Sequence, residues 1–182
     1  MPPPRLGSSA LGALKAALIS ACSGGAGRCV VVLGNQAADP DSCASAIALS
    51  LSLAETVKDE EVAVAPLIPI PRDDFSLQLD RVHLLRRAKL RGEGDGGAWR
   101  PTDVAFIDDV DLHALGRSGR LELVLVDHNK LCDELAPLAH CVRGIVDHHQ
   151  DEGEYRQLGA DDRTIELGIG SCASLVAERI RT

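Results

Sequence analysis

The sequence predicts an α/β domain built on a doubly wound, mostly parallel sheet with helices on both faces. Short apolar runs rich in β-branched residues alternate along the chain with segments of helical periodicity, which is typical of this class. A length of 182 residues suits a single domain of this kind. Acidic residues and histidines follow several expected strands directly, at the end where such sheets bind ligands.

Five strands and four helices are expected from these patterns. The strands are apolar runs at residues 29–33, 62–68, 104–107, 121–126 and 142–146. The helices carry apolar residues on one side at residues 11–22, 42–57, 77–89 and 171–179. Residues 91–97 are expected to be a flexible connection, and residues 1–9 a flexible N-terminus before a domain that spans residues 10–182.

Composition and charge exclude several classes of protein. With 27 acidic and 19 basic residues the net charge is −8, and 2% of residues are aromatic, so a nucleic-acid partner is not expected. No apolar run approaches the roughly 20 residues of a membrane span, and no clear signal peptide is present. The six cysteines form no CxxC pair and no zinc-ligand spacing. We therefore expect scattered buried thiols in a cytoplasmic protein, with the nucleus as a further location.

Three expected strands run into side chains that bind divalent cations. Asp39 and Asp41 follow the first strand as an Asp-x-Asp pair. Because alternate residues of an extended segment diverge, each of the two carboxylates can address a different cation. Carboxylates beside imidazoles suit Mn²⁺ or Mg²⁺. Two later strands end in such groups, as Val126-Asp127-His128-Asn129 and Val146-Asp147-His148-His149.

Structural explanations remain open for some of the acidic residues. Asp39 and Asp41 can form a turn in which Ser42 or Asp41 caps the following helix. An acidic helix N-terminus explains the aspartates at 108, 109 and 111 without any metal. The acidic pairs at 151–152 and 161–162 are expected to be solvated turns. These last two groups are left out of the predicted site.

The motifs, taken in order, resemble those of the DHH phosphoesterase family. They are Gly34-Asn35-x-x-x-Asp39-x-Asp41-Ser42, the two Asp-His motifs at 126–129 and 146–149, and Gly170-Ser171-Cys172-Ala173. The resemblance covers roughly residues 10–180 and is nearest to the prune-like, exopolyphosphatase branch. Asn35, which stands where most of the family has histidine, is one feature shared with that branch.

The resemblance implies a phosphohydrolase in which two cations, Mn²⁺ or Mg²⁺, activate water against the phosphoanhydride bonds of short-chain polyphosphate. It implies that Asp39 binds one cation, that Asp41 and His148 bind the other, and that Asp127 bridges both. His149 would contact the phosphoryl group, with His128 beside the substrate as a second catalytic candidate. Another small phosphorylated substrate, cyclic-nucleotide phosphodiesterase activity and nucleoside diphosphate kinase as a partner are further implications.

Two departures from the family pattern bear on the alternative functions. The neutral amide of Asn35 is a weaker ligand than histidine, so looser binding of the first cation is expected. Because prune-like members share this asparagine, the resemblance argues against an inorganic pyrophosphatase, the first alternative. The family continues past the Gly-Ser helix into another metal-binding aspartate and a second, DHHA2-like domain, whereas this sequence ends at Thr182. We therefore expect a fragment, an alternative isoform or an incomplete gene model. A catalytically impaired interaction protein with the same fold is the second alternative.

Overall fold

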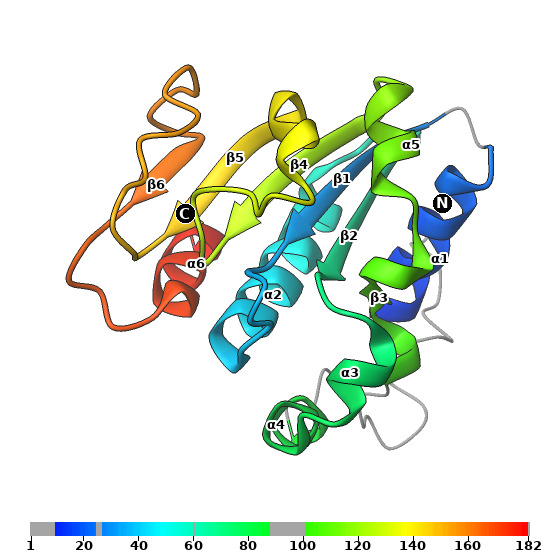
Figure 1. Cartoon of the computed structure of the whole chain (residues 1–182), viewed down its shortest axis with the longest axis horizontal. Helices are drawn as coiled ribbons and strands as arrows, with labels where there is room; N and C mark the ends of the chain where they lie inside the picture. Colours follow the sequence, from blue (N-terminus) through cyan, green and yellow to red (C-terminus); the bar gives the residue numbers. More distant parts are fainter. Residues whose placement is uncertain (1–9, 25–26, 60, 88–100, 182) are drawn as a thin grey trace.

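The structure is a computed structural model that describes residues 10–24, 27–59, 61–87 and 101–181. The expected flexible segments at 1–9 and 91–97 lie outside the described residues. Six strands form one all-parallel sheet in the order β3-β2-β1-β4-β5-β6 (Figure 1). They are β1 (Arg28–Leu33), β2 (Val62–Ile68), β3 (Ala105–Phe106), β4 (Leu121–Val126), β5 (Val142–Asp147) and β6 (Arg163–Ile165).

Helices cover both faces of this sheet, so the predicted α/β class is confirmed. They are α1 (Ala10–Cys22), α2 (Pro40–Thr56), α3 (Arg72–Ser76), α4 (Leu79–Arg87), α5 (Leu112–Arg117) and α6 (Cys172–Arg181). Short 3₁₀ turns lie at Pro101–Asp103, Ile107–Asp109 and Ala136–Cys141. Among the described helices, none has the length and apolarity that crossing a membrane requires.

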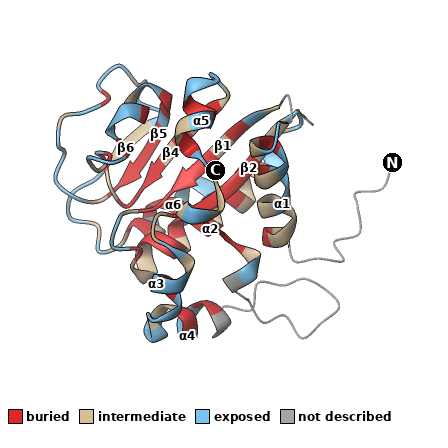
Figure 2. Cartoon of the chain, turned by 45° about the vertical axis from the view of Figure 1, so that its right-hand side comes forward, coloured by how far each residue is buried: buried red, intermediate tan, exposed pale blue. Residues whose placement is uncertain are grey.

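The core follows from the two-residue alternation of the central strands. In β1, Val31 and Leu33 face the layer that contains α1 and α5, whereas Val32 faces α2 and α6. In β4, Leu123 faces the layer of α1 and α5, and Val126 faces the layer of α2 and α6. The sheet is therefore buried between two helical layers (Figure 2), which is why its strands read as continuous apolar runs.

The connections run in opposite directions on either side of β1. From β1 the chain continues outward through β2 and β3, then returns to β4 and continues through β5 to β6. The chain therefore reverses its winding between β1 and β4, and the loops after these two strands leave a crevice at their carboxyl ends. The Asp-x-Asp pair follows β1 and Asp127 follows β4, so both of these motifs lie at that crevice.

The expected helix at 77–89 is confirmed as α4 over Leu79–Arg87, and a short helix that was not expected, α3, precedes it. Phe75 is fully buried against Phe106, and Val82 is buried in the same cluster, but Leu77 and Leu79 point to solvent. α3 ends at its C-cap Leu77 and α4 begins at Leu79, so two short helices bury Phe75 and Val82 in one cluster. Residues 88–89 lie outside the described part of the chain.

Two strands at the edges of the sheet also differ from expectation. β3 is shorter than predicted because a 3₁₀ turn begins at Ile107, where Asp109 Oδ2 accepts a hydrogen bond from Phe106 N at 3.0 Å. Asp111 does cap α5, accepting from Ala114 N at 2.8 Å, as an acidic helix N-terminus predicts. β6 was missed because its three residues, all half-buried, show no alternation of apolar and polar residues.

The buried central strand predicts a large difference between two leucine substitutions. Leu123→Ala in β4 removes a fully buried side chain and should cost roughly 2–5 kcal/mol of unfolding free energy. Leu77→Ala, at a position 77% exposed, should cost less than about 0.5 kcal/mol. Urea unfolding followed by circular dichroism measures both, and equal losses would contradict this description of the core.

Candidate metal centre

The loop after β1 folds back tightly onto the start of α2. Gly34 directly follows β1, and a Cβ atom there would lie 2.4 Å from Ser42 Oγ, so this position requires glycine. The same Ser42 hydroxyl accepts a hydrogen bond from Asn35 N at 2.6 Å. Ala38 N donates to Asn35 O at 2.9 Å and closes a turn in which Ala38 has a φ of 47°. The first motif is therefore a compact turn that holds its polar side chains at the edge of the sheet.

The two carboxylates of the Asp-x-Asp pair have different partners. Asp39 is the N-cap of α2 and accepts from Ser42 N at 2.9 Å. The expectation that Ser42 or Asp41 caps this helix is therefore wrong, because α2 already begins at Pro40. Burial works to raise the pKa of Asp39, but the Ser42 backbone N–H and the Asn35 amide donate to it and hold its pKa below the usual value.

Asp41 lies in the first turn of α2 rather than in an extended segment, and it reaches the N-terminus of α6. Its Oδ1 accepts hydrogen bonds from Ser171 Oγ and Ala173 N, and its Oδ2 accepts one from Cys172 N, each at 2.8 Å. Backbone N–H groups at a helix N-terminus favour an anion at this place. The Gly-Ser motif at the end of the sequence therefore holds Asp41, about 130 residues away along the chain.

Asp127 follows β4 and has an uncommon backbone conformation. Its φ of 63° lies in the left-handed region, and the residue is 3% exposed. Asn35 Nδ2 donates to Asp127 Oδ2 at 2.9 Å and to Asp39 Oδ2 at 3.1 Å. Asp127 Oδ1 is buried without a hydrogen-bond partner among the described residues. Burial, followed by repulsion from Asp41 and Asp39, raises the pKa of Asp127 to about 7.

His148 points its free nitrogen at these carboxylates. Its Nδ1 lies 2.8 Å from Ile169 O and must donate there, which leaves a lone pair on Nε2 in the neutral ring. Nε2 lies 3.2 Å from Asp127 Oδ1 and 3.8 Å from Asp41 Oδ2. Electron-rich atoms this close repel each other unless a proton or a metal cation lies between them. The three residues therefore form a site that is complete only with a positive charge at its centre.

His149 is turned toward the same centre by Asp147, which is fully buried. His149 Nδ1 lies 2.8 Å from Asp147 Oδ1, and the backbone N–H groups of His148 and His149 donate to the same oxygen at 2.8 and 3.3 Å. The hydrogen bond to Asp147 is the main reason that the pKa of His149 is raised. His149 is thereby held as a partly exposed, readily protonated ring next to Asp127.

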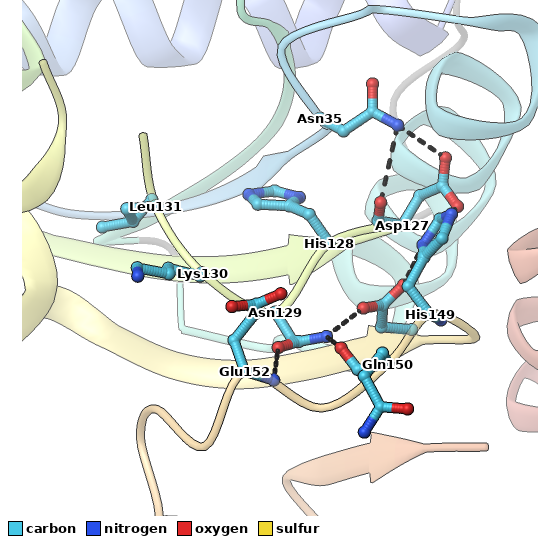
Figure 3. A pocket seen from close by; sticks show the side chains of 10 residues that line it. Asn35, Asp127, His128, Asn129, Lys130, Leu131, His149, Gln150 and Glu152 are labelled. Atoms are coloured by element: carbon cyan, nitrogen blue, oxygen red, sulfur yellow. Dashed lines mark hydrogen bonds and ion pairs between the residues drawn. The ribbon is translucent and has the colours of Figure 1, made fainter. Parts of the chain in front are cut away.

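An open pocket of about 490 Å³ adjoins this cluster (Figure 3). His128 lines it and donates from Nδ1 to Val126 O at 2.9 Å, and burial lowers the pKa of this ring, so it is neutral. Asn129 and Asp147 line the same pocket. Asp147 belongs to the cluster of carboxylates and imidazoles expected at the strand ends, but neither residue is among the predicted metal or catalytic residues. The signal for Asp147 was present, because it is the first residue after an apolar run, but its burial was not predictable.

These residues fit a divalent cation by three observations on the chain itself. Asp127, His148 and His149 each offer a ligand atom, and the three atoms lie within 4.8 Å of one another. Within the described residues, Asp127 Oδ1 and Asn35 Oδ1 are buried without a hydrogen-bond partner. A half-turn of the Asn35 amide would bring its unpaired oxygen to Asp39 and Asp127 as a neutral ligand. Oxygen and imidazole nitrogen ligands in this combination suit Mn²⁺ or Mg²⁺.

Comparisons with known proteins agree with this geometry. Residues 29–181 match the model of the DHH family, N-terminal domain. The chain belongs to the DHH family. It is 41% identical over 151 residues to exopolyphosphatase PRUNE1 of Bos taurus and 39% identical over 151 residues to the Homo sapiens protein of that name. It is 36% identical over 146 residues to a putative exopolyphosphatase of Schizosaccharomyces pombe.

These matches confirm the resemblance to the prune-like branch, and they also show its extent. The alignments to the two PRUNE1 proteins cover 82% of this chain but 30% of each relative, and the alignment to the S. pombe protein covers 80% and 34%. The chain thus spans about a third of the length of the relatives it matches.

The raised pKa of Asp127 predicts how the stability of the metal-free protein depends on pH. Between pH 3.8 and about 7 the folded state retains a proton that the unfolded state releases, so stability falls as pH rises through this range. Asp127→Asn removes this loss. Its Tm should exceed that of the wild type by a few degrees at pH 8, with no gain at pH 4, since about 1 kcal/mol shifts Tm by roughly 2–4 °C.

Differential scanning calorimetry in a chelating buffer measures this difference at each pH. Asp111→Asn is the matched control, because it changes an exposed cap of α5 away from the carboxylates, and it should not show the gain in Tm at pH 8 expected for Asp127→Asn. Adding Mn²⁺ should reverse the order of stability at pH 8. A pH-independent gain for Asp127→Asn would contradict the account of this carboxylate.

Proposed function

We propose that this chain is the metal-binding part of a phosphohydrolase that acts on the phosphoanhydride bonds of short-chain polyphosphate. The observation that carries the proposal is the unpaired Asp127 Oδ1 facing His148 Nε2 at the edge of an open pocket. Membership of the DHH family and the names of the relatives, which are exopolyphosphatases, support the same reaction class.

Five side chains would hold the cations. Asp41, His148 and Asp127 Oδ1 surround one position, and Asp39, Asn35 and Asp127 Oδ2 surround the other. When bound, Mn²⁺ or Mg²⁺ lowers the pKa of a coordinated water molecule and neutralises charge on phosphoryl oxygens. Asp127 would contribute to both positions, and because its pKa is about 7 it would have to give up its proton near neutral pH to act as a ligand.

The histidines take complementary roles in the pocket. His149, whose pKa is raised by Asp147, is positively charged more readily than an isolated histidine and binds a phosphoryl oxygen. His128 is kept neutral by burial, with Nδ1 donating to Val126, so its Nε2 remains an acceptor on the pocket side. Lys130 also lines the pocket and adds a second positive charge for a further phosphoryl group.

From the resemblance to the prune-like branch we further propose a cytoplasmic or nuclear location, nucleoside diphosphate kinase as a partner, and an additional cyclic-nucleotide phosphodiesterase activity. The prune-like branch shares Asn35 where most of the family has histidine, so the resemblance favours polyphosphate over pyrophosphate as the substrate.

Phosphate release from tripolyphosphate in the presence of Mn²⁺ tests the proposal. The wild-type chain should release phosphate, and Asp127→Ala should lower kcat/KM by at least about 100-fold, because it removes the carboxylate shared by both cation positions. Asp111→Asn, away from the pocket, should retain full activity. Pyrophosphate and a cyclic nucleotide, assayed in parallel, should be hydrolysed more slowly than tripolyphosphate.

Other outcomes distinguish the alternatives. Faster hydrolysis of pyrophosphate than of tripolyphosphate would favour an inorganic pyrophosphatase. If calorimetry shows that Mn²⁺ binds but the wild type is no faster than Asp127→Ala, the hydrolase proposal fails for this chain and a DHH-fold interaction protein is favoured.

A further inference from the structure

Asn129 is a buried amide whose hydrogen-bonding groups join two loops of the pocket. It is 3% exposed, and its Nδ2 donates to Asp147 Oδ2 at 2.5 Å and to Gln150 O at 3.0 Å. Its Oδ1 accepts from Glu152 N at 2.8 Å (Figure 3). Asn129 follows β4, whereas its three partners lie at or after the end of β5, so one side chain fixes the two strand ends relative to each other.

Asp147 depends on this amide for half of its carboxylate. Its Oδ1 is used by His149 Nδ1 and by two backbone N–H groups, whereas within the described residues its Oδ2 has Asn129 Nδ2 as its side-chain partner. Asp147 is fully buried, so water cannot replace a lost donor without rearrangement. Loss of the Asn129 donor would therefore leave a buried carboxylate oxygen unpaired, and the carboxylate would turn or shift.

His149 depends on Asp147 in turn. Its side chain is 55% exposed, so packing alone does not fix the ring. It contacts the ring of His148 at a centroid distance of 4.3 Å, and its hydrogen bond is the one from Nδ1 to Asp147. With Nδ1 held there, Nε2 is left free for a ligand in the pocket.

We propose that Asn129 is a positioning residue that acts through Asp147 to fix the ring of His149, and so sets how firmly the pocket binds a phosphoryl group. The orientation of His149 follows from the contacts alone. Only the phosphoryl group rests on the proposed function.

The first readout is the His149 Nδ1–H proton in nitrogen-edited NMR spectra of the metal-free chain. Held by a buried carboxylate, this proton exchanges slowly and gives a separate downfield signal, which His149→Gln identifies by its loss. Asn129→Leu has nearly the same shape but no donor for Asp147, and it should abolish the signal. Asn129→His, whose Nδ1 lies near the place of the amide nitrogen, retains a donor and should preserve it.

Tyr155→Phe is the matched control. Tyr155 is buried and its hydroxyl accepts from Leu131 N at 3.4 Å, so the substitution removes another buried polar contact beside the same loops without touching Asp147. It should keep the His149 signal. If Asn129→Leu does not fold, Asn129→Ser tests the same contact, since serine is too short to reach Asp147. A signal that survives in the folded Leu or Ser variant would overturn the proposal.

The second readout is the affinity for inorganic phosphate of the Mn²⁺-loaded chain, measured by calorimetry. Asn129→Leu should weaken phosphate binding about tenfold, the usual worth of one charge-assisted hydrogen bond, while Mn²⁺ affinity changes less than about threefold. If the chain hydrolyses tripolyphosphate, KM should rise by the same factor with little change in kcat. Because the NMR signal needs no turnover, a chain without hydrolase activity would refute the proposed function and leave this inference standing. Unchanged phosphate affinity in a variant that has lost the signal would overturn the proposal that the position of His149 sets how firmly the pocket binds a phosphoryl group.

Discussion

The repulsion among buried carboxylates at one edge of the sheet is the constraint on which the rest of the site depends. Asp127 is buried, lies next to Asp39 and Asp41, and has one oxygen without a hydrogen bond among the described residues. Burying such a group costs stability unless a positive charge compensates it. The amide of Asn35 donates a hydrogen bond to Asp127 Oδ2, which stabilises that oxygen. Asp127 Oδ1 instead faces His148 Nε2, where a cation can bind.

The parallel sheet brings this cluster together from distant parts of the sequence. The reversal of winding between β1 and β4 places three strand ends around one crevice, and the N-termini of α2 and α6 meet there. Asp39 caps α2, and Asp41 accepts hydrogen bonds from the first residues of α6. The same carboxylates that face the pocket therefore also anchor two helices, which couples the geometry of the site to the stability of the fold.

The sequence was sufficient to predict the sheet and the main acidic and histidine positions, because buried strands have continuous apolar runs and Asp127 and His148 lie directly at or after their ends. It was insufficient wherever structure depends on contacts between loops. The N-cap at Asp39 depends on the turn before Pro40, and the short helix α3 depends on the burial of Phe75. The hydrogen bonds of Asn129 and Asp147 join loops about 20 residues apart, which no local pattern reports.

The central claim is that a divalent cation belongs between Asp41, Asp127 and His148. A crystal of this chain grown with Mn²⁺, measured near the manganese absorption edge, tests it most directly through the anomalous difference map. We expect a peak within coordination distance of Asp127 Oδ1 and His148 Nε2, with His148 Nδ1 still hydrogen-bonded to Ile169 O. A Mn²⁺-containing crystal with no peak there, and with His148 hydrogen-bonded to Asp127 instead, would contradict it.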